Sequence, residues 1–564
     1  MHGKPQLDSE FEHFPYVNRE APKGGKLVMG EVGGFDSLNG YILKGRAPWQ
    51  VRALMGESLL ARNWDEPFAL YGLLAESVET PADRSWVAFS LRQNARFSDG
   101  SPVTVEDVIW SMETLGTSGH PRYRNAWASV EKIEATGPSR VRIDFSEPNR
   151  ELPLIMGLRP ILKRDQWQDS DFVNSDSVLA VGSGPYILTD HEAGRFLEFQ
   201  RNPDWWGAEL PVNRGLYNFD KVRIEYFRND DAYWEAVKTG AISLHADYDP
   251  VRWEEGYDIP SVREGKLLRD ELTHQRPTGL RGFVFNTRRE VFADRDLRAA
   301  LALSFDWEWI NQRLYRGVYQ RIESAFGNSP LGFDGPAGAT ERGILEGFDL
   351  PDGTLEDGWR PPKSDGSGRD RRALRAAGRL LDGAGWVIED GRRMKNGQPL
   401  AFEILTSGTE QETLASLWSR QLERLGIAAT VRRVDQAQYQ QRRETYDYDM
   451  IVNRWGMSLS PGTEQRLYFH SSGRELEGTR NYMGVADPAV DAAIDALLAA
   501  EGTEDFQSAV RALDRVLNAG IYVIPFGVLP TDRLAHTPDL HRPESQTLYG
   551  WWGWAAGPAR WWAE

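Results

Sequence analysis

Side chains that could bind a small molecule gather in one stretch of the chain, residues 446–465. Large apolar side chains in its first half fall on every second position, at Tyr446, Tyr448, Met450 and Val452. This spacing predicts a half-buried strand, which ends at Trp455 and Gly456 and continues as a turn-prone loop. An aromatic ring beside hydroxyl groups suits ligand binding, although a tryptophan that closes a hydrophobic core would have the same sequence.

Residue patterns of catalysis and metal binding are missing. The nine histidines include no His-Glu-x-x-His pair, no Gly-x-Ser-x-Gly elbow is present, and no Gly-Lys pair continues into a phosphate-binding loop. Asp447 and Asp449 could in principle be the carboxylate pair of a glycosidase. With 83 acidic residues in the chain, however, this spacing favours an ordinary solvated strand end. We therefore expect no metal, no cofactor and no enzymatic activity, and favour binding over catalysis.

Length and charge limit the architecture and the partners. A chain of 564 residues is longer than one hydrophobic core usually serves, so two or three domains or lobes are expected. The net charge of −17 argues against nucleic acid and anionic membrane surfaces as partners. The chain has no cysteine, which excludes disulfides and thiolate chemistry. No apolar run is long enough to span a bilayer, and no signal peptide is recognised.

Predicted strands and helices must position these residues. A short strand is expected at residues 26–29, and the loop at 35–39 suits either a ligand site or a plain Asx turn. Thr104 is expected to cap a helix, with Asp107 as its capping-box partner. Residues 331–370 are rich in glycine, proline and aspartate, which predicts a surface excursion or partial disorder.

Six short motifs together resemble one protein family. They occur in the family's order, at residues 97–108 (FSDGSPVTVEDV), 182–186 (GSGPY), 201–207 (RNPDWWG), 296–301 (DLRAAL), 384–386 (AGW) and 396–400 (NGQPL). Each motif is weak alone, but the ordered set covers most of the chain. On these motifs the chain resembles the solute-binding proteins of peptide-type ABC importers, which form extracellular solute-binding family 5.

A narrower resemblance is to the YejA-like subgroup of this family. It rests on the stretches 1–5 (MHGKP), 13–18 (HFPYVN), 21–25 (APKGG), 458–462 (SLSPG) and 464–466 (EQR). The opening of the chain also looks like that of α-galactoside-binding relatives. The subgroup resemblance therefore does not separate a peptide ligand from a sugar.

The resemblance implies an α/β fold with two lobes, the type II, cluster C fold of periplasmic binding proteins, with an extra domain inserted in the first lobe. The expected segments are 1–44, 182–272 and 526–564 for lobe I, 45–181 for the inserted domain and 273–525 for lobe II. Chain crossings near 271–276 and 524–528 would form a hinge, and closure would expel water from the cleft. The resemblance also implies a periplasmic monomer, with its signal peptide removed, that delivers ligand to the permease subunits of an ABC transporter.

One position departs from the family pattern. Peptide-binding relatives typically carry an aspartate shortly after the tryptophan that matches Trp455, and this aspartate holds the free amine of the peptide. Here no acid follows Trp455 until Glu464. A buried ammonium group needs a partner. Either Asp36, Asp435 or Glu464 replaces the missing aspartate, or the amine is not held there, or the ligand is not a peptide.

Two ligand classes therefore stay open. Oligopeptide binding is the first hypothesis, and oligosaccharide binding is the second, because sugar rings present apolar faces that suit tryptophan. A hydrolase, and a chaperone-like or signalling receptor on the same scaffold, are further alternatives. Trp455 is expected to supply a stacking face, Ser458 hydrogen bonds and Arg454 a charge partner. The predicted ligand-binding residues are Phe35, Asp36, Leu38, Asn39, Trp49, Arg454, Trp455, Gly456, Met457, Ser458, Asn481 and Tyr482.

Overall fold

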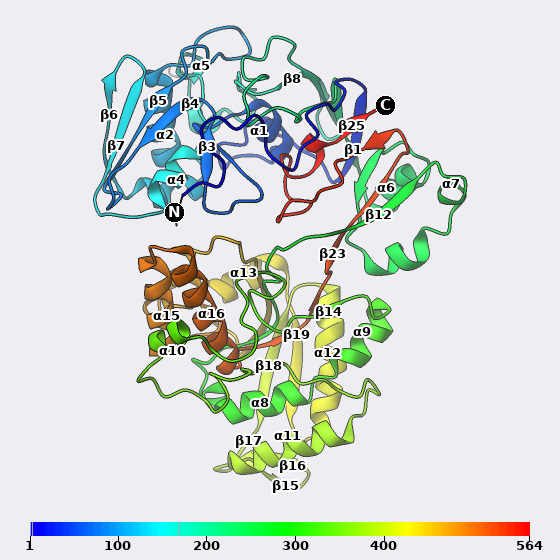
Figure 1. The fold of residues 1–564 in the computed structure, drawn as a ribbon. Coiled ribbons are helices and arrows are strands. Elements are labelled where there is room, and N and C mark those ends of the chain that lie inside the picture. Colours follow the sequence, from blue (N-terminus) through cyan, green and yellow to red (C-terminus); the bar gives the residue numbers. More distant parts are fainter. Residues whose placement is uncertain (1, 3, 168–169) are drawn as a thin grey trace.

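The computed structural model folds into two lobes (Figure 1) and describes residues 2, 4–167 and 170–564. Residues 1 and 3, part of the motif at 1–5, lie outside this description. The chain leaves lobe I after β12 (Leu268–Thr273) and enters lobe II at β13 (Leu280–Phe285). It returns after β21 (Val523–Pro525) through β23 (Thr531–His536), which pairs with β12 inside lobe I. The two lobes are therefore joined by two neighbouring crossings.

Lobe I is built on a sheet whose strands come from distant parts of the sequence. The strand order is β8 (Tyr186–Glu192), β9 (Phe196–Arg201), β10 (Lys221–Phe227) and β1 (Lys26–Val32). β1 runs parallel to β10. β11 (Leu244–Ala246) follows on the other side of β1, because Ser243 N donates a hydrogen bond to Val28 O (2.9 Å). β11 also pairs with β23, which links the sheet to the crossings.

A small domain is inserted into lobe I. Its sheet has the order β4 (Ala75–Glu79), β5 (Trp86–Leu91), β7 (Arg140–Phe145) and β6 (Val130–Gly137). α2 (Val105–Thr117) packs on this sheet through its buried apolar face. The predicted capping box is confirmed, because Thr104 Oγ1 accepts from Asp107 N (3.2 Å) and Asp107 Oδ2 accepts from Thr104 N (2.9 Å). The segment boundaries after residues 44, 181, 272 and 525 stay predictions.

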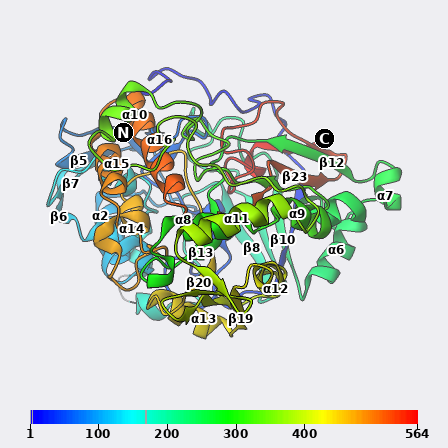
Figure 2. The ribbon, with the colours of Figure 1, turned by 90° about the horizontal axis from the view of Figure 1, so that it is seen from below.

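Lobe II holds a five-stranded sheet that is buried on both faces. The strand order is β19 (Ala428–Arg433), β18 (Ala401–Thr406), β20 (Met450–Trp455), β13 and β21. Two pairs of helices cover it, α8 (Arg295–Leu303) with α12 (Thr409–Glu423) and α15 (Pro488–Ala499) with α16 (Thr503–Ala519). Phe283 and Val452 belong to the core under the first pair, and Val284 and Ile451 to the core under the second. Figure 2 shows α15 and α16 on one side of lobe II and α12 on the other.

The start of β20 corrects the sequence analysis. The strand predicted from Tyr446 begins instead at Met450, because Tyr446 adopts a left-handed backbone conformation with φ 56°. Tyr446 and Tyr448 are buried in a turn, where Tyr448 OH donates to Tyr482 O (2.8 Å). The alternating apolar positions at Tyr446 and Tyr448 therefore reflect a turn that buries both tyrosines, and not the start of a strand.

Residues 331–370 run irregularly along lobe II and contain the short helix α10 (Ala339–Ile344). The buried Arg515 of α16 holds this excursion, donating to Glu341 Oε2 (2.7 Å) and to the backbone oxygens of residues 335 (2.7 Å) and 356 (3.0 Å). No helix in the described part of the chain is long and apolar enough to cross a membrane.

Candidate ligand-binding site

The carboxyl ends of parallel strands in both lobes lie at the chain crossings. In lobe II, β18, β19 and β20 run in one direction, and Trp455 at the end of β20 pairs with Leu280, just after the first crossing. In lobe I, Ala246 at the end of β11 pairs with Leu534, just after the second crossing. Ligands of α/β proteins bind outside such strand ends, where loops carry free polar groups.

An acidic group and an exposed tryptophan meet at the end of β1. Glu31 Oε1 accepts hydrogen bonds from Trp49 Nε1 (3.1 Å) and Gln50 Nε2 (2.9 Å), at the start of α1 (Trp49–Met55). Trp49 remains 41% exposed. The predicted ligand residue Trp49 therefore has a free aromatic surface beside a carboxylate that the sequence analysis did not select.

Tyr248 follows β11 and is 68% exposed. The surrounding protein nevertheless desolvates the phenol and raises the pKa of Tyr248. The charges of Asp532, Arg276, Glu31 and Arg454, which come from both lobes, also act on this pKa. Tyr248 is therefore exposed beside the crossings, within electrostatic reach of charged groups from both lobes. No motif in the sequence marks Tyr248, so the sequence analysis missed it.

A buried ion pair holds the backbone just before Tyr248. Asp247 is fully buried and accepts hydrogen bonds from Arg252 Nε (2.8 Å), Arg252 Nη2 (2.6 Å) and Tyr257 OH (3.0 Å). Burial opposes ionisation, but the nearby His245 ring (Nε2–Oδ2 3.5 Å) and the hydrogen bonds from Arg252 hold the pKa of Asp247 well below its ordinary value. Asp247 is therefore charged and anchors the segment that presents Tyr248.

A second ion pair joins the two crossings. Arg276 donates to Asp532 Oδ1 through Nη2 (2.5 Å) and to Asp532 Oδ2 through Nη1 (3.0 Å). Asp532 Oδ2 also accepts from Trp551 N (2.7 Å). The next residue, Trp552, is 54% exposed, and its ring centroid lies 5.7 Å from the Arg276 guanidinium carbon. The crossings thus present a third exposed aromatic ring, which is not among the predicted ligand-binding residues.

Lobe II contributes the end of β20 and the loop after it. Arg454 is exposed, and its charge reaches Tyr248. Gly456 is exposed, and Met457 and Ser458 are half-buried. Ser458 Oγ accepts a hydrogen bond from the backbone N–H two residues on (3.2 Å). These four predicted residues lie at the end of β20 that faces the crossings.

Trp455 occupies a different place from the one expected. Its ring is fully buried, with ring centroids 6.2 Å from Phe469 and 5.7 Å from Tyr482, and its Nε1 donates to Arg480 O (3.1 Å). Successive side chains of a strand point to opposite faces, so the exposure of Arg454 and the burial of Trp455 go together. This placement corrects the predicted stacking role of Trp455, and Tyr482 is buried with it.

The other predicted residues stabilise their own loops. The buried Asn481 amide exchanges hydrogen bonds with the backbone of residue 485 (2.8 and 2.9 Å). Phe35 and Leu38 are buried in the core of lobe I. Asn39 is also buried, and its Oδ1 accepts from the backbone N–H two residues on (3.0 Å), which confirms the Asx-turn alternative. Of the four side chains predicted in this loop, only the Asp36 carboxylate is exposed to solvent.

The acids considered for a ligand amine are engaged in local contacts. Asp36 accepts from the backbone N–H of residue 46 (2.5 Å), and Asp435 caps α13 (Gln436–Glu444). Glu464 accepts from Gly462 N (3.1 and 3.2 Å). Two acids, Asp532 and Glu31, act on the exposed ring of Tyr248. Asp532 is already paired with Arg276, whereas Glu31 forms hydrogen bonds only with the neutral side chains of Trp49 and Gln50 in the described part of the chain.

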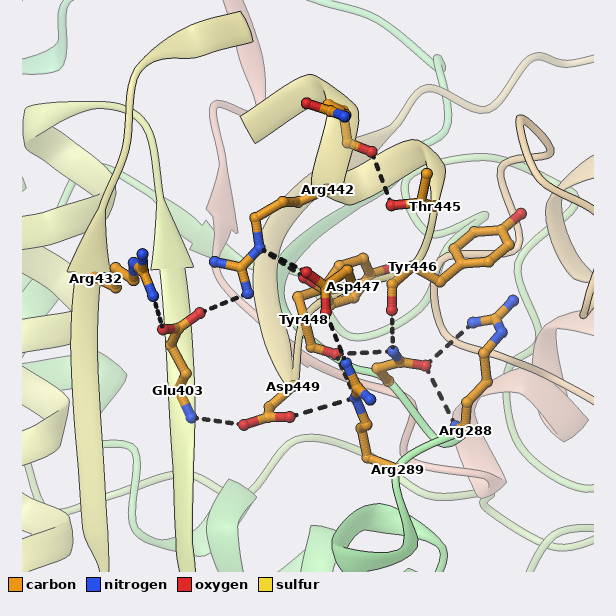
Figure 3. A network of polar contacts seen from close by, with 12 residues as sticks. Arg288, Arg289, Glu403, Arg432, Arg442, Thr445, Tyr446, Asp447, Tyr448 and Asp449 are labelled. Atoms are coloured by element: carbon orange, nitrogen blue, oxygen red, sulfur yellow. Dashed lines mark hydrogen bonds and ion pairs between the residues drawn. The ribbon is translucent and has the colours of Figure 1, made fainter. Parts of the chain in front are cut away.

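The carboxylates considered for glycosidase chemistry lie at the opposite end of β20 from Trp455 (Figure 3). Asp447 pairs with Arg289 (3.2 Å) and Arg442 (3.4 Å), and Asp449 pairs with Arg289 (3.4 Å). Glu403 of β18 pairs with Arg442 as well (2.9 Å). Each acid is matched by a guanidinium, so this end of the strand is an ion-pair network.

Comparison with known proteins places the whole chain in one family. The family model for bacterial extracellular solute-binding proteins, family 5, matches residues 69–476. The peptidoglycan-binding protein YepA of Agrobacterium fabrum is 40% identical over 98% of this chain and 94% of its own length. The YejA protein of Escherichia coli is 33% identical over 98% of this chain and 92% of its own length.

Solved structures share the fold at low sequence identity. NikA from Brucella suis, in complex with Fe(III)-EDTA, has a TM-score of 0.70 at 21% identity and covers 92% of this chain and 96% of its own. The oligopeptide-binding protein AppA from Bacillus subtilis, in complex with a nonapeptide, has a TM-score of 0.68 at 17% identity and covers 97% and 100%. Together with the family model, these likenesses confirm the two-lobed α/β fold expected from the sequence. The chain belongs to the YejA-like subgroup of family 5, the solute-binding proteins of ABC importers, and is a binding protein rather than an enzyme.

Proposed function

We propose that this protein captures peptides in the periplasm, closes its two lobes around them and delivers them to the permease of an ABC importer, acting as a monomer. The observation that carries this proposal is the group of side chains at the crossings, where Glu31 Oε1 accepts from the exposed Trp49 (3.1 Å) and where Arg454 and the ring of Tyr248 are exposed. Glu31 of lobe I and Arg454 of lobe II both act on this exposed ring. A peptide carries an ammonium group and a carboxylate, which suit an acid and a guanidinium on opposite sides of one cleft.

The proposed site consists of side chains from both lobes and the crossings, namely Glu31, Trp49, Tyr248, Arg454, Met457, Ser458 and Trp552. Trp49, Tyr248 and Trp552 supply exposed aromatic surface for the body of the ligand. Glu31 takes the place of the aspartate missing after Trp455 and holds the amine. The AppA complex with a nonapeptide supports a peptide in a cleft of this fold.

An oligosaccharide is the second candidate, and a peptidoglycan fragment combines both chemistries. Three exposed aromatic rings at one cleft suit the apolar faces of sugar rings. The name of YepA supports a ligand from peptidoglycan, in which sugars and short peptides are joined.

Native mass spectrometry of the purified protein, followed by denaturation and identification of what is released, tests the proposal. A set of short peptides would support it, and an oligosaccharide mass without amino acids would replace it with the second candidate. If nothing is released, thermal unfolding is measured with peptides, galactosides and muropeptides. A ligand at 100 times its dissociation constant should add about 2.7 kcal/mol to the free energy of unfolding.

A further inference from the structure

The inserted domain contacts lobe II beside the loop that follows β20. Glu151 lies just before α4 (Leu152–Gly157), and its carboxylate accepts hydrogen bonds from Thr463 Oγ1 (2.7 Å) and Thr463 N (3.1 and 3.2 Å). The preceding residue, Arg150, pairs with Glu501 of lobe II (Nη2–Oε1 2.7 Å). We call these four residues, together with Gly462, the latch.

The latch is closely packed at Gly462. A Cβ atom added to Gly462 would lie 1.3 Å from Glu151 Oε1, so the carboxylate occupies the space that a side chain at position 462 would need. Glu151 is half-buried, and burial together with the charge of Glu464 raises its pKa, while the hydrogen bonds from Thr463 oppose this shift. Opening the lobes would exchange these charge-assisted hydrogen bonds for bonds to water, so the latch contributes the net stabilisation of the bonds that are lost.

The latch acts on the same loop as the proposed ligand site. Residues 456–463 begin with Gly456, Met457 and Ser458 on the cleft and end at Thr463. The loop is therefore held from lobe I at Thr463, while its first residues belong to the proposed ligand site.

We infer that Glu151 is a positioning residue by which the inserted domain holds the lobes closed and the 456–463 loop in place, so that a bound ligand leaves only after the latch breaks. The effect on ligand release rests on the proposed function, whereas the effect on closure does not. The inserted domain then contributes to retention of the ligand without touching it. Retention of this kind lowers the dissociation rate.

Lobe closure is measured in the ligand-free protein. Because the chain has no cysteine, Thr136→Cys on β6 and Glu423→Cys at the end of α12, both exposed, accept a pair of spin labels or fluorophores. Glu151→Ala should lower the ratio of closed to open molecules about tenfold, and Glu151→Gln, which keeps one oxygen, should lower it less. Glu131→Ala, an exposed acid of the same domain, is the control and should leave the ratio unchanged.

Gly462→Ala separates a latch from a general loss of stability. In the otherwise unchanged protein it should open the lobes as Glu151→Ala does, because the added methyl displaces the carboxylate. In the Glu151→Ala background it should add nothing, since the space is then empty. Equal effects of Gly462→Ala in both backgrounds, or an unchanged distance in Glu151→Ala, would overturn the inference. A shifted distance in a protein that binds neither peptides nor sugars would keep the latch and reject the proposed function.

Discussion

The two ends of β20 carry charge in different ways. At the Met450 end, Asp447 and Asp449 are paired with arginines (Figure 3). At the other end Arg454 is exposed, and within the described part of the chain no carboxylate forms an ion pair with it. Paired charges hold a loop in place, whereas an exposed charge beside exposed rings is available to a ligand. The charges at the Met450 end of β20 are thus structural, whereas Arg454 at the other end is available to a ligand.

Trp455→Ala should have the largest effect, on stability. The ring is fully buried between Phe469 and Tyr482, and its removal leaves a cavity that costs roughly 3–5 kcal/mol of unfolding free energy. Unfolding in urea measures the change. The matched control is Trp552→Ala, which removes an exposed ring and should cost less than about 0.5 kcal/mol. Equal losses in the two variants would contradict the buried position of Trp455.

Asp247→Asn should have the second largest effect on stability. Asp247 forms a buried ion pair, although it directly precedes the exposed Tyr248 of the proposed site. Breaking its buried pair with Arg252 should cost about 3 kcal/mol at neutral pH. The folded state lowers the pKa of Asp247. Its contribution to stability is therefore complete above the unfolded pKa of about 3.9 and is lost as the pH falls through the lower folded value.

Unfolding free energies at a series of acidic pH values check this sign. Below a pH of about 4 the stability of the unchanged protein should fall more steeply than that of Asp247→Asn. Asp258→Asn, at an exposed carboxylate of the same lobe, should keep the steep fall. Parallel curves for Asp247→Asn and the unchanged protein would show that Asp247 is not charged in the fold.

Arg454→Ala removes the free charge at the cleft end of β20. The dissociation constant of the ligand identified by mass spectrometry should rise roughly 10- to 100-fold, as expected for loss of a charge-assisted hydrogen bond. Calorimetric titration measures it. Arg442→Ala, in the ion-pair network at the other end, should leave the dissociation constant unchanged. If both variants bind alike, the distinction between the two ends of the strand fails.

Tyr248→Ala should weaken binding about tenfold, through the loss of an exposed ring, without lowering stability. Tyr248→Phe keeps the ring and removes the hydroxyl, so the pair of variants separates stacking from hydrogen bonding. Binding by Tyr248→Phe that matches the unchanged protein would assign the contact to the ring. Full affinity in Tyr248→Ala would remove this residue from the site.

Local patterns were enough to predict much of the fold. The capping box at Thr104 depends on residues three positions apart, and the ordered family motifs identified the two-lobed architecture. The ligand-binding site was harder to predict than the fold, because the exposure of a side chain depends on tertiary contacts. Trp455 and Arg454 are neighbours in the sequence, yet only the β20 register decides which of them is buried. Tyr248 and Arg454 lie on different lobes and are far apart in the sequence, so no local pattern could bring them to one site.

Asp447→Asn should have the smallest effect of these substitutions, confined to stability, and it tests the ion-paired end of β20. Its ion pairs with Arg289 and Arg442 involve partly exposed groups, so the loss should be less than about 1 kcal/mol of unfolding free energy. Ligand affinity should not change, because Asp447 precedes β20 at the end opposite the cleft. High salt screens exposed pairs and should shrink the difference further. A change in affinity would show that charge at the far end of the strand reaches the cleft, and the two ends would then be one electrostatic unit.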